Sequence, residues 1–231
     1  DEYFVLNDSS LWNVSEEPER LMESGVSRIK VWGASTVAAG KMFVRKEDGS
    51  LWAKGYKGDG QLGVGSIELV ENLTPIMEKD VKEVVNGSGA TFVIKTNGSL
   101  WAMGRNQNGE LGVTPEDGNY TIPLQVVDSG VKNVYPLANR TFFSKEDGSL
   151  WGMGENSAGQ LGDGSTEDRE LPVKILEGGF KEILESGDDI TFFMKDDNSL
   201  WGMGQQRWGE LGTGDTKKQE SPVQVTDSQV N

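Results

Sequence analysis

The stretch Gly148-Ser149-Leu150-Trp151 decides the fold, because the chain repeats it at a regular spacing. Two further copies are identical, and two differ only in the first residue: Gly49-Ser50-Leu51-Trp52, Gly98-Ser99-Leu100-Trp101, Asn198-Ser199-Leu200-Trp201 and Ser9-Ser10-Leu11-Trp12. The tryptophans of these copies lie at positions 12, 52, 101, 151 and 201. A period of about 50 residues indicates one supersecondary unit copied in tandem.

Each copy predicts four short strands. An apolar alternation such as Val81–Val84 opens the copy, and a strand such as Thr91–Lys95 then runs into an Asp-Gly or Asn-Gly turn. That dipeptide between two apolar runs is the strongest short-range hairpin signal. The Ser-Leu-Trp strand follows, and a Gly-rich loop separates it from a last strand that carries a proline, at Pro75, Pro123, Pro172 and Pro222. Proline cannot donate to a strand ladder, so we expect it at an edge or a strand start.

Four short strands per copy predict an all-β fold, a β-propeller of four-stranded blades. We count five hairpins, near residues 3–12, 42–52, 91–101, 141–151 and 191–201, and expect five blades in one domain over residues 1–231. A single blade cannot bury both of its faces, so the copies must pack against one another. The tryptophans and a second aromatic column should fill the space between blades; this column is Tyr3, Phe43, Phe92, Phe142 and Phe192.

The first copy is shorter than the others. It has no opening strand, and Pro18 follows Trp12 without a Gly-rich loop between them. The sequence ends at Val230-Asn231, where the pattern would start a new opening strand. Two arrangements explain this: the C-terminal segment pairs with the N-terminal blade and closes a ring, or the sequence is a section of a longer array.

Composition excludes several classes of function. The formal net charge is -15, with no basic stripe, and this disfavours nucleic acids and anionic membranes. No apolar run is long enough to insert into a membrane, and the absence of Cys and His excludes disulfides, thiol nucleophiles, catalytic triads and most zinc sites. The sequence starts at Asp1 with neither Met nor signal peptide, so we expect a processed product. We predict a monomer without cofactor.

The Gly-rich loop identifies a family. It reads G-x-N-x-x-G-[QE]-L-G, as in Gly104–Gly112 and Gly154–Gly162, and follows a Leu-Trp pair in four copies. This pattern resembles the repeat of the regulator of chromosome condensation family and covers nearly the whole chain. The resemblance implies a propeller, usually of seven blades. Similar repeats occur in an ultraviolet photoreceptor, in a secreted β-lactamase inhibitory protein and in many secreted or surface bacterial proteins. The fold therefore does not fix the function.

The chain departs from the family pattern in ways that bear on function. The family's second Trp is replaced, the frequent His is missing, and the loop Asn is absent from two copies; the residues involved are Lys54, Met103, Met153, Met203, Lys57 and Gln206. Nucleotide exchange on a small nuclear GTPase at chromatin is not carried over, because the chain is acidic. We expect a bacterial propeller that is secreted or at the cell surface, with a cytoplasmic location as the alternative.

Carboxylates are the only catalytic groups left. Asp188 and Asp189 break the repeat, because the matching residues are Ser88-Gly89 and Ala138-Asn139. They are the candidate site of a carbohydrate-binding or glycoside-hydrolysing propeller, which needs two carboxylates; a solvated turn is the structural alternative. The run Asp163–Asp168 lacks the full acidic spacing of a calcium loop, so we predict no metal.

Protein binding is the function that we favour from the sequence. Loops at one face of a propeller are displayed on a stiff scaffold, and residues that break the repeat there are the candidates. Tyr, Trp and Arg dominate interface hot spots. The candidates are Tyr56, Lys57, Arg105, Tyr120, Arg207 and Trp208. Local packing of these side chains, for Trp208 in particular, is the alternative. We therefore predict a non-enzymatic scaffold that binds an unidentified protein.

Overall fold

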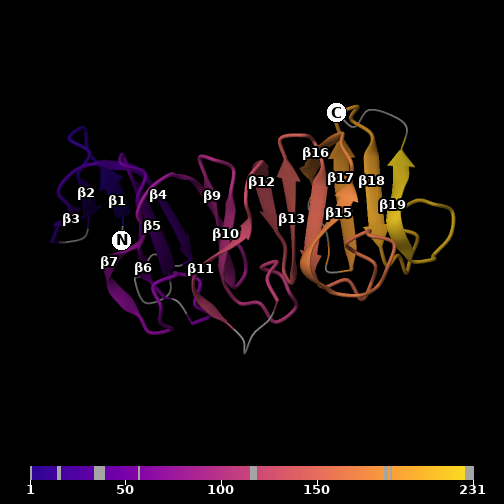
Figure 1. The fold of residues 1–231 in the computed structure, drawn as a ribbon, viewed down its shortest axis with the longest axis horizontal. Helices are drawn as coiled ribbons and strands as arrows, with labels where there is room; N and C mark the ends of the chain where they lie inside the picture. Colours follow the sequence, from indigo (N-terminus) through magenta and orange to yellow (C-terminus); the bar gives the residue numbers. More distant parts are fainter. Residues whose placement is uncertain are drawn as a thin grey trace. The chain divides into compact units, whose positions relative to one another are not determined.

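The computed structural model describes residues 2–14, 17–33, 40–56, 58–114, 119–184, 187 and 189–226. These residues form 19 strands and no helix. The predicted all-β fold class is therefore confirmed (Figure 1).

The strands form five antiparallel sheets, which we call blades 1 to 5 in chain order. Blade 1 contains β1 (Glu2–Val5), β2 (Leu11–Val14) and β3 (Glu19–Met22). Blade 2 contains β4 (Val26–Gly33), β5 (Gly40–Lys46), β6 (Leu51–Gly55) and β7 (Val70–Met77). Blade 3 contains β8 (Val81–Asn86), β9 (Ala90–Lys95), β10 (Leu100–Gly104) and β11 (Tyr120–Val127). Blade 4 contains β12 (Val131–Pro136), β13 (Arg140–Lys145), β14 (Leu150–Gly154) and β15 (Arg169–Leu176). Blade 5 contains β16 (Phe180–Ile183), β17 (Ile190–Lys195), β18 (Leu200–Gly204) and β19 (Gln219–Thr226).

Neighbouring strands in each blade follow one another in sequence. Blades 2 to 5 have four strands each, whereas the described part of blade 1 has three, in the order β1-β2-β3. The register shows why: Phe4 lies opposite Trp12 as Phe143 lies opposite Trp151, so β1 is the second strand of its copy. The pairing of the C-terminal segment, residues 227–231, lies outside the described residues, so ring closure stays a prediction.

The contacts divide the chain into two compact units. The first unit comprises residues 1–105 and 119–129, and the second comprises residues 106–118 and 130–231. Blades 1 to 3 therefore belong to the first unit, and blades 4 and 5 to the second. The prediction of one domain over residues 1–231 stays a prediction.

The hairpin turn explains the first letter of the repeated stretch. Gly148 has a φ of 79°, in the left-handed region that glycine adopts without steric cost. Where the copies replace glycine, Asn198 and Ser9 keep this conformation, with φ values of 62° and 60°. The position is therefore fixed by backbone geometry in every copy.

The same turn explains the Asp, Ser and Trp of the repeat. In blade 4, Ser149 donates from its backbone N (2.9 Å) and its Oγ (2.6 Å) to Asp147 Oδ1. Trp151 Nε1 donates to Ser149 Oγ at 3.0 Å, and Lys145 Nζ lies 4.8 Å from the centre of the indole ring. Each Ser-Leu-Trp copy contains this indole–serine bond, so the repeated stretch is a structural unit.

Both aromatic columns pack between blades as predicted, because Phe43 and Phe142 belong to core clusters shared by two blades and Trp52, Trp101 and Trp201 lie against such clusters; the columns differ in burial. Phe43, Phe92 and Phe142 are at most 1% exposed and lie in the core. The five tryptophans of the repeat are only half-buried. Their indole N–H groups bond to serine at the hairpin turn, and Lys or Arg side chains cover the rings, so one edge of each ring stays near solvent.

One predicted alignment is wrong. The sequence pattern places Pro75 at the same point of its copy as Pro123. In the structure Trp52 lies opposite Pro75, whereas Trp101 lies opposite Gln125. Pro75 therefore sits two residues later in its strand than Pro123, and Leu73 takes the place of that proline.

Candidate functional site

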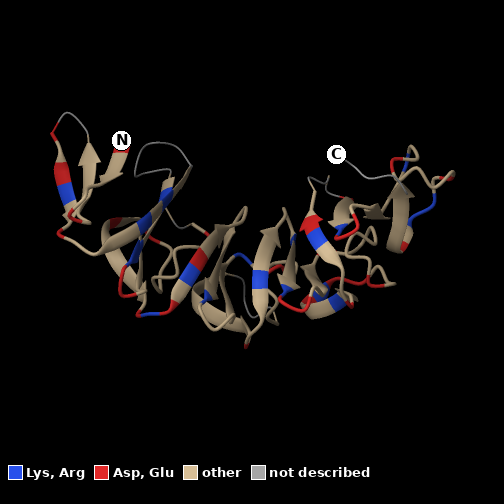
Figure 2. Cartoon of the chain, turned by 90° about the horizontal axis from the view of Figure 1, so that it is seen from above, with Lys and Arg blue, Asp and Glu red and all other residues tan. Residues whose placement is uncertain are grey.

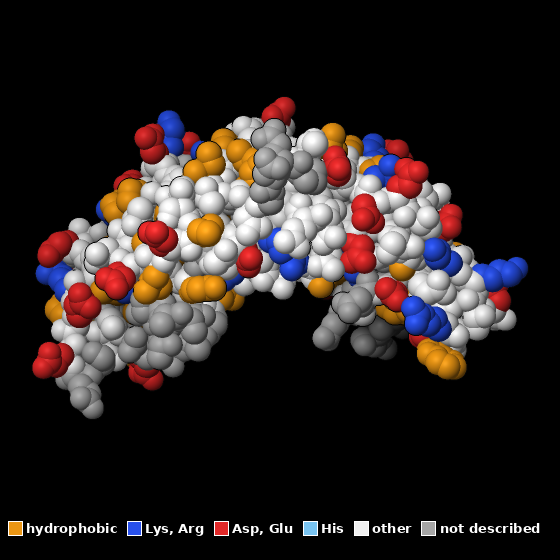
Figure 3. All heavy atoms as spheres, turned by 90° about the horizontal axis from the view of Figure 1, so that it is seen from below, with side chains coloured by type: hydrophobic (Ala, Val, Ile, Leu, Met, Phe, Trp, Pro, Cys, Tyr) orange, Lys and Arg blue, Asp and Glu red, His pale blue; other side chains and the backbone are white. Residues whose placement is uncertain are grey.

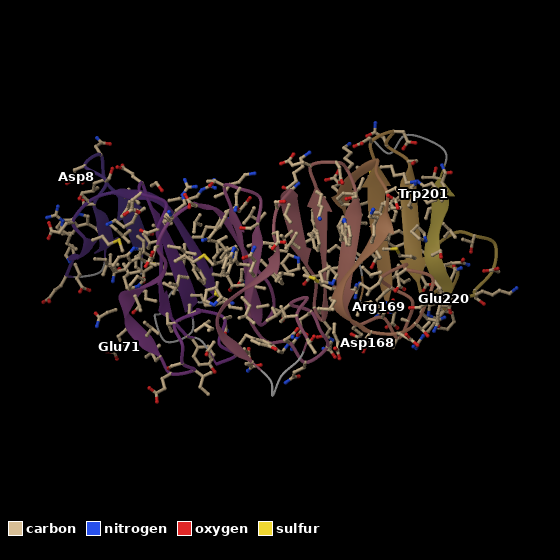
Figure 4. All side chains as sticks on the ribbon, viewed as in Figure 1. Asp8, Glu71, Asp168, Arg169, Trp201 and Glu220 are labelled. Carbon is tan, nitrogen blue, oxygen red and sulfur yellow. The ribbon has the colours of Figure 1, made fainter. Side chains whose placement is uncertain are left out.

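Each blade has a turn end, where the hairpin joins the second and third strands, and a loop end, where the Gly-rich loop leaves the third strand. In the first unit, Asp8 lies at the turn end and Glu71 near the loop end of their blades (Figure 4). In the second unit, Trp201 lies toward the turn end, whereas Arg169 and Glu220 lie toward the loop end (Figure 4). The described residues among those predicted to bind a partner are at the loop end: Tyr56, Arg105, Tyr120, Arg207 and Trp208.

The Asn of the Gly-rich loop holds the loop together. Asn156 is fully buried; its Oδ1 accepts from Leu161 N at 2.9 Å, and its Nδ2 donates to Asp163 Oδ1 at 3.0 Å. Nδ2 also reaches the carbonyl oxygens of Ser165 and Glu167, at 3.1 Å each. Because these partners are the loop's own backbone and side chains, Asn at this position is structural.

Gln206 replaces this Asn in blade 5 and keeps the same role. It is fully buried, its Oε1 accepts from Leu211 N at 3.3 Å, and its Nε2 donates to Thr213 Oγ1 and to Lys217 O. The repeat departure at Gln206 is therefore tolerated by the fold and marks no binding site.

Within a unit, the Gly-rich loop of one blade packs on the next blade. A Cβ on Gly162 would overlap Met203 Sδ and lie 3.3 Å from Pro222 Cδ. In the first unit, a Cβ on Gly63 would likewise overlap Met103 Sδ. Methionines at the position of the family's second Trp thus contact the glycines of the preceding loop.

Three binding candidates lie at the loop end of blades 2 and 3. Tyr56 is 52% exposed, whereas Arg105 and Tyr120 are half-buried. A Cβ on Gly89 would lie 3.2 Å from Arg105 Cβ and 3.3 Å from Asp59 Oδ2, so these two side chains converge above Gly89. The loop end of the first unit therefore carries the exposed ring of Tyr56 and, beside Gly89, the side chains of Arg105 and Asp59.

Two further candidates lie at the loop end of blade 5. Trp208 is 88% exposed, so the alternative that its ring packs locally is wrong. Arg207 NH2 lies 3.6 Å from Asp189 Oδ2, and both side chains are exposed, at 71% and 48%. Trp208 N donates to Glu210 Oε2 at 2.8 Å, and this bond is the main reason that the pKa of Glu210 is lowered. The loop backbone is thus fixed while the indole faces solvent.

Two of the predicted residues, Lys57 and Asp188, lie outside the described residues. Asp189, the described half of the acidic alternative, pairs with Arg207 as given above. The described residues therefore supply one carboxylate of the pair that glycoside hydrolysis requires.

The acidic run after Gly162 is occupied by the protein's own donors. Asp163 Oδ1 accepts from Ser165 N and Asn156 Nδ2, and Oδ2 accepts from Arg169 Nε at 2.5 Å. Burial raises the pKa of Asp163, but the bonds from Arg169 and Ser165 outweigh it and lower the pKa overall. Among the residues that the structure describes, no three acidic, Cys or His side chains are grouped as metal ligands.

Acidic and basic side chains are interspersed over both units (Figure 2). None of the described residues forms a helix with the length and hydrophobicity of a membrane crossing.

Sequence reasoning missed three exposed apolar residues, Ile67, Leu69 and Ile122. For Ile67 and Leu69 the signal was available in a comparison of two copies, because the segment 64–70 is apolar at points where the segment 163–169 is polar; Ile122 carried no such signal, because Leu171 matches it in blade 4.

The comparisons with known proteins support this geometry. Residues 147–194 match the family model described as Regulator of chromosome condensation (RCC1) repeat. A search of curated protein sequences finds no match. Among solved structures, yeast RCC1 (Prp20) bound to Kap60 is 18% identical, with a TM-score of 0.68 over 93% of this chain and 52% of that chain. Prp20p from Saccharomyces cerevisiae is 18% identical, with a TM-score of 0.66 over 93% of this chain and 54% of that chain. Human WBSCR16 is 18% identical, with a TM-score of 0.64 over 92% of this chain and 56% of that chain.

The chain thus spans about half the length of these structures. At this level of identity the likeness concerns the fold. Together with the one matching repeat at residues 147–194 and the five blades, it confirms the resemblance inferred from the loop: the chain has the β-propeller fold of these structures and resembles the regulator of chromosome condensation family in its repeat.

Proposed function

We propose that this chain is a non-enzymatic propeller scaffold that binds a protein through copy-specific residues at the loop end of its blades. Residues 1–231 act as one domain and as a monomer in this proposal. A secreted or cell-surface location, in a bacterium, belongs to the same proposal.

The single observation that carries the proposal is the 88% exposure of Trp208. The matching residue in blade 4 is Ala158, which is 8% exposed, so the repeat does not require an aromatic ring here. An exposed indole beside the Arg207 guanidinium combines the two residue types that contribute most at protein interfaces. The fixed backbone of the loop lowers the entropy that binding would cost.

The solved neighbours support protein binding as a use of this fold. Prp20 is described as bound to Kap60, and in a second structure by its binding properties to Gsp1p and histones. We do not extend those partners to this chain, whose net charge is -15. A scaffold with a different partner is consistent with a shared fold and divergent loops.

Carbohydrate binding is the second candidate, because an exposed indole ring also stacks on sugars. The glycoside-hydrolase form of this idea is weaker, since Asp189 is paired with Arg207. A glycan panel assayed with Trp208→Ala and Asp189→Ala separates the two ideas: glycan binding that depends on Trp208 would replace the protein-binding proposal.

The test is a cross-linking capture of partners with purified wild-type chain and two variants. Trp208→Ala should lose the captured protein. Leu171→Ala is the matched control, because Leu171 is an apolar residue that is 58% exposed on β15 of the same unit. Equal capture by both variants would remove Trp208 from the site, and loss with Leu171→Ala alone would move the site to the outer strand.

A further inference from the structure

Three apolar side chains of the first unit are exposed on the loop between β6 and β7 and on β11, and we call them the apolar loop patch: Ile67 (59% exposed), Leu69 (46%) and Ile122 (54%). The loop between β6 and β7 lies against β11, because Gly65 N donates to Thr121 O at 2.7 Å. A Cβ on Gly65 would lie 3.9 Å from Ile122 Cγ2. The loop and the strand thus present their apolar side chains together.

The repeat itself shows that the side chains of Ile67 and Leu69 are not needed by the fold. Ile67 stands where blade 4 has Thr166, and Leu69 stands where it has Asp168. Asp168 Oδ1 accepts from Asn156 N at 2.7 Å, a bond that leucine cannot make. Two other apolar replacements in the same loop, Val64 and Val70, are half-buried and pack on the core, whereas Ile67 and Leu69 remain in solvent.

The chain around the patch carries only negative charge. Residues 58–78 contain Asp59, Glu68, Glu71 and Glu78 but no Lys or Arg, and residues 119–127 carry no charged side chain. Glu68, between Ile67 and Leu69, and Glu71 are exposed. Figure 3 shows apolar, acidic and basic side chains interspersed on the face that it displays. An apolar centre with an acidic rim is complementary to apolar side chains flanked by Lys or Arg.

We propose that the apolar loop patch binds a basic amphipathic segment of a partner protein, with apolar residues on one side and Lys or Arg beside them. Ile67, Leu69 and Ile122 would bury the partner's apolar side chains, and Glu68 and Glu71 would pair with its cations. The patch lies in the first unit and its binding does not depend on Trp208, so this proposal and the proposed function can fail separately.

The experiment measures fluorescence anisotropy of a labelled amphipathic helical peptide, made of Leu and Lys, with the purified chain. The key variant is Ile67→Thr with Leu69→Asp, which installs the residues of blade 4 in blade 2. Removing two aliphatic side chains that the bound peptide would partly bury should weaken binding about tenfold or more. The variant is also more acidic, so attraction by charge alone would strengthen binding instead.

Three controls complete the test. Circular dichroism and a thermal melt should show that the double variant folds like wild type, because both positions are exposed. A peptide with Glu in place of Lys should not bind, and Trp208→Ala should bind the Leu-Lys peptide as wild type does. Unchanged affinity of the double variant, binding of the Glu peptide, or loss of binding with Trp208→Ala would each overturn the proposal.

Discussion

The loop after β14 and the loop after β18 carry the same motif in different surroundings. In the first, residues 155–168, Ala158 and Gln160 are buried, and a Cβ on Gly159 would lie 3.3 Å from Glu220 Cα of the next blade. In the second, residues 205–218, a Cβ on Gly209 would have only its own loop within 4 Å among the described residues, and Trp208 is 88% exposed.

The comparison distinguishes residues of the motif that stabilise the loop itself from residues that contact the following blade. The bonds of Asn156 and Gln206 are present in both loops, so they hold the loop itself. Contact with a following blade is present in one loop among the described residues of blades 4 and 5. The loop after β18 is therefore one that no described blade covers.

The largest effect is expected from the bonds shared by both loops. Asn156→Ala would leave Leu161 N–H and several buried loop oxygens without their partner, and each such loss costs about 1–3 kcal/mol. We expect the free energy of unfolding to fall by about 3 kcal/mol or more. Urea unfolding measures it. Asn156→Gln is the control, because Gln206 makes the same bond to Leu211 N, and it should recover most of the loss.

Alanine substitutions at two matched glycines should affect the stability of the two loops differently. Gly162 and Gly212 have φ values of 73° and 63°, so Ala is strained at both, by about 1 kcal/mol. At Gly162 the new Cβ would also overlap Met203 Sδ, whereas at Gly212 no atom of the described part of the chain would lie within 4 Å of the new Cβ. Gly162→Ala should therefore cost about 1–3 kcal/mol more than Gly212→Ala. Equal unfolding free energies would mean that the loop after β14 is not covered as described.

Acid should weaken the first loop at Asp163 and the second at Glu210, because the pKa of each carboxyl is lowered in the folded protein. The pKa of Asp163 is lowered in the folded protein, so its contribution is complete above the unfolded value of about 3.9 and is lost as the pH falls through the lower folded value. The second loop has Thr213 at this position. Asp163→Thr should flatten the dependence of the urea midpoint on pH below about pH 4, relative to wild type. A wild-type slope in the variant would show that Asp163 is not the group responsible.

The fold was predictable because its signals are local. Asp147, Ser149 and Trp151 form hydrogen bonds within one hairpin turn, and Asn156 forms its bonds within its own loop. The residues that determine the structure of each copy are therefore close together in the sequence. The half-burial of Trp151 was not predictable, since it depends on Lys145 and Lys174 covering the ring.

The site was predictable only in part. Trp208 and Arg207 stood out because they break the repeat, whereas their exposure and the ion pair with Asp189 required the fold. Ile67 and Leu69 are exposed, and the sequence alone does not distinguish an exposed apolar loop residue from a buried one such as Val64. The exposure of a loop residue depends on strands far away in the sequence, such as β11 beside Gly65.

The central claim is that residues copied in every repeat hold the scaffold, whereas copy-specific exposed residues bind. The most direct test measures the affinity for the captured partner and the unfolding free energy of Trp208→Ala and Trp151→Ala together. Trp208→Ala should lose about tenfold or more in affinity and less than about 0.5 kcal/mol in stability.

Trp151→Ala should lose about 2 kcal/mol in stability, less than the 3–5 kcal/mol typical of a fully buried Trp, and keep its affinity while folded. Wild-type affinity in Trp208→Ala, or loss of affinity in folded Trp151→Ala, would contradict the claim.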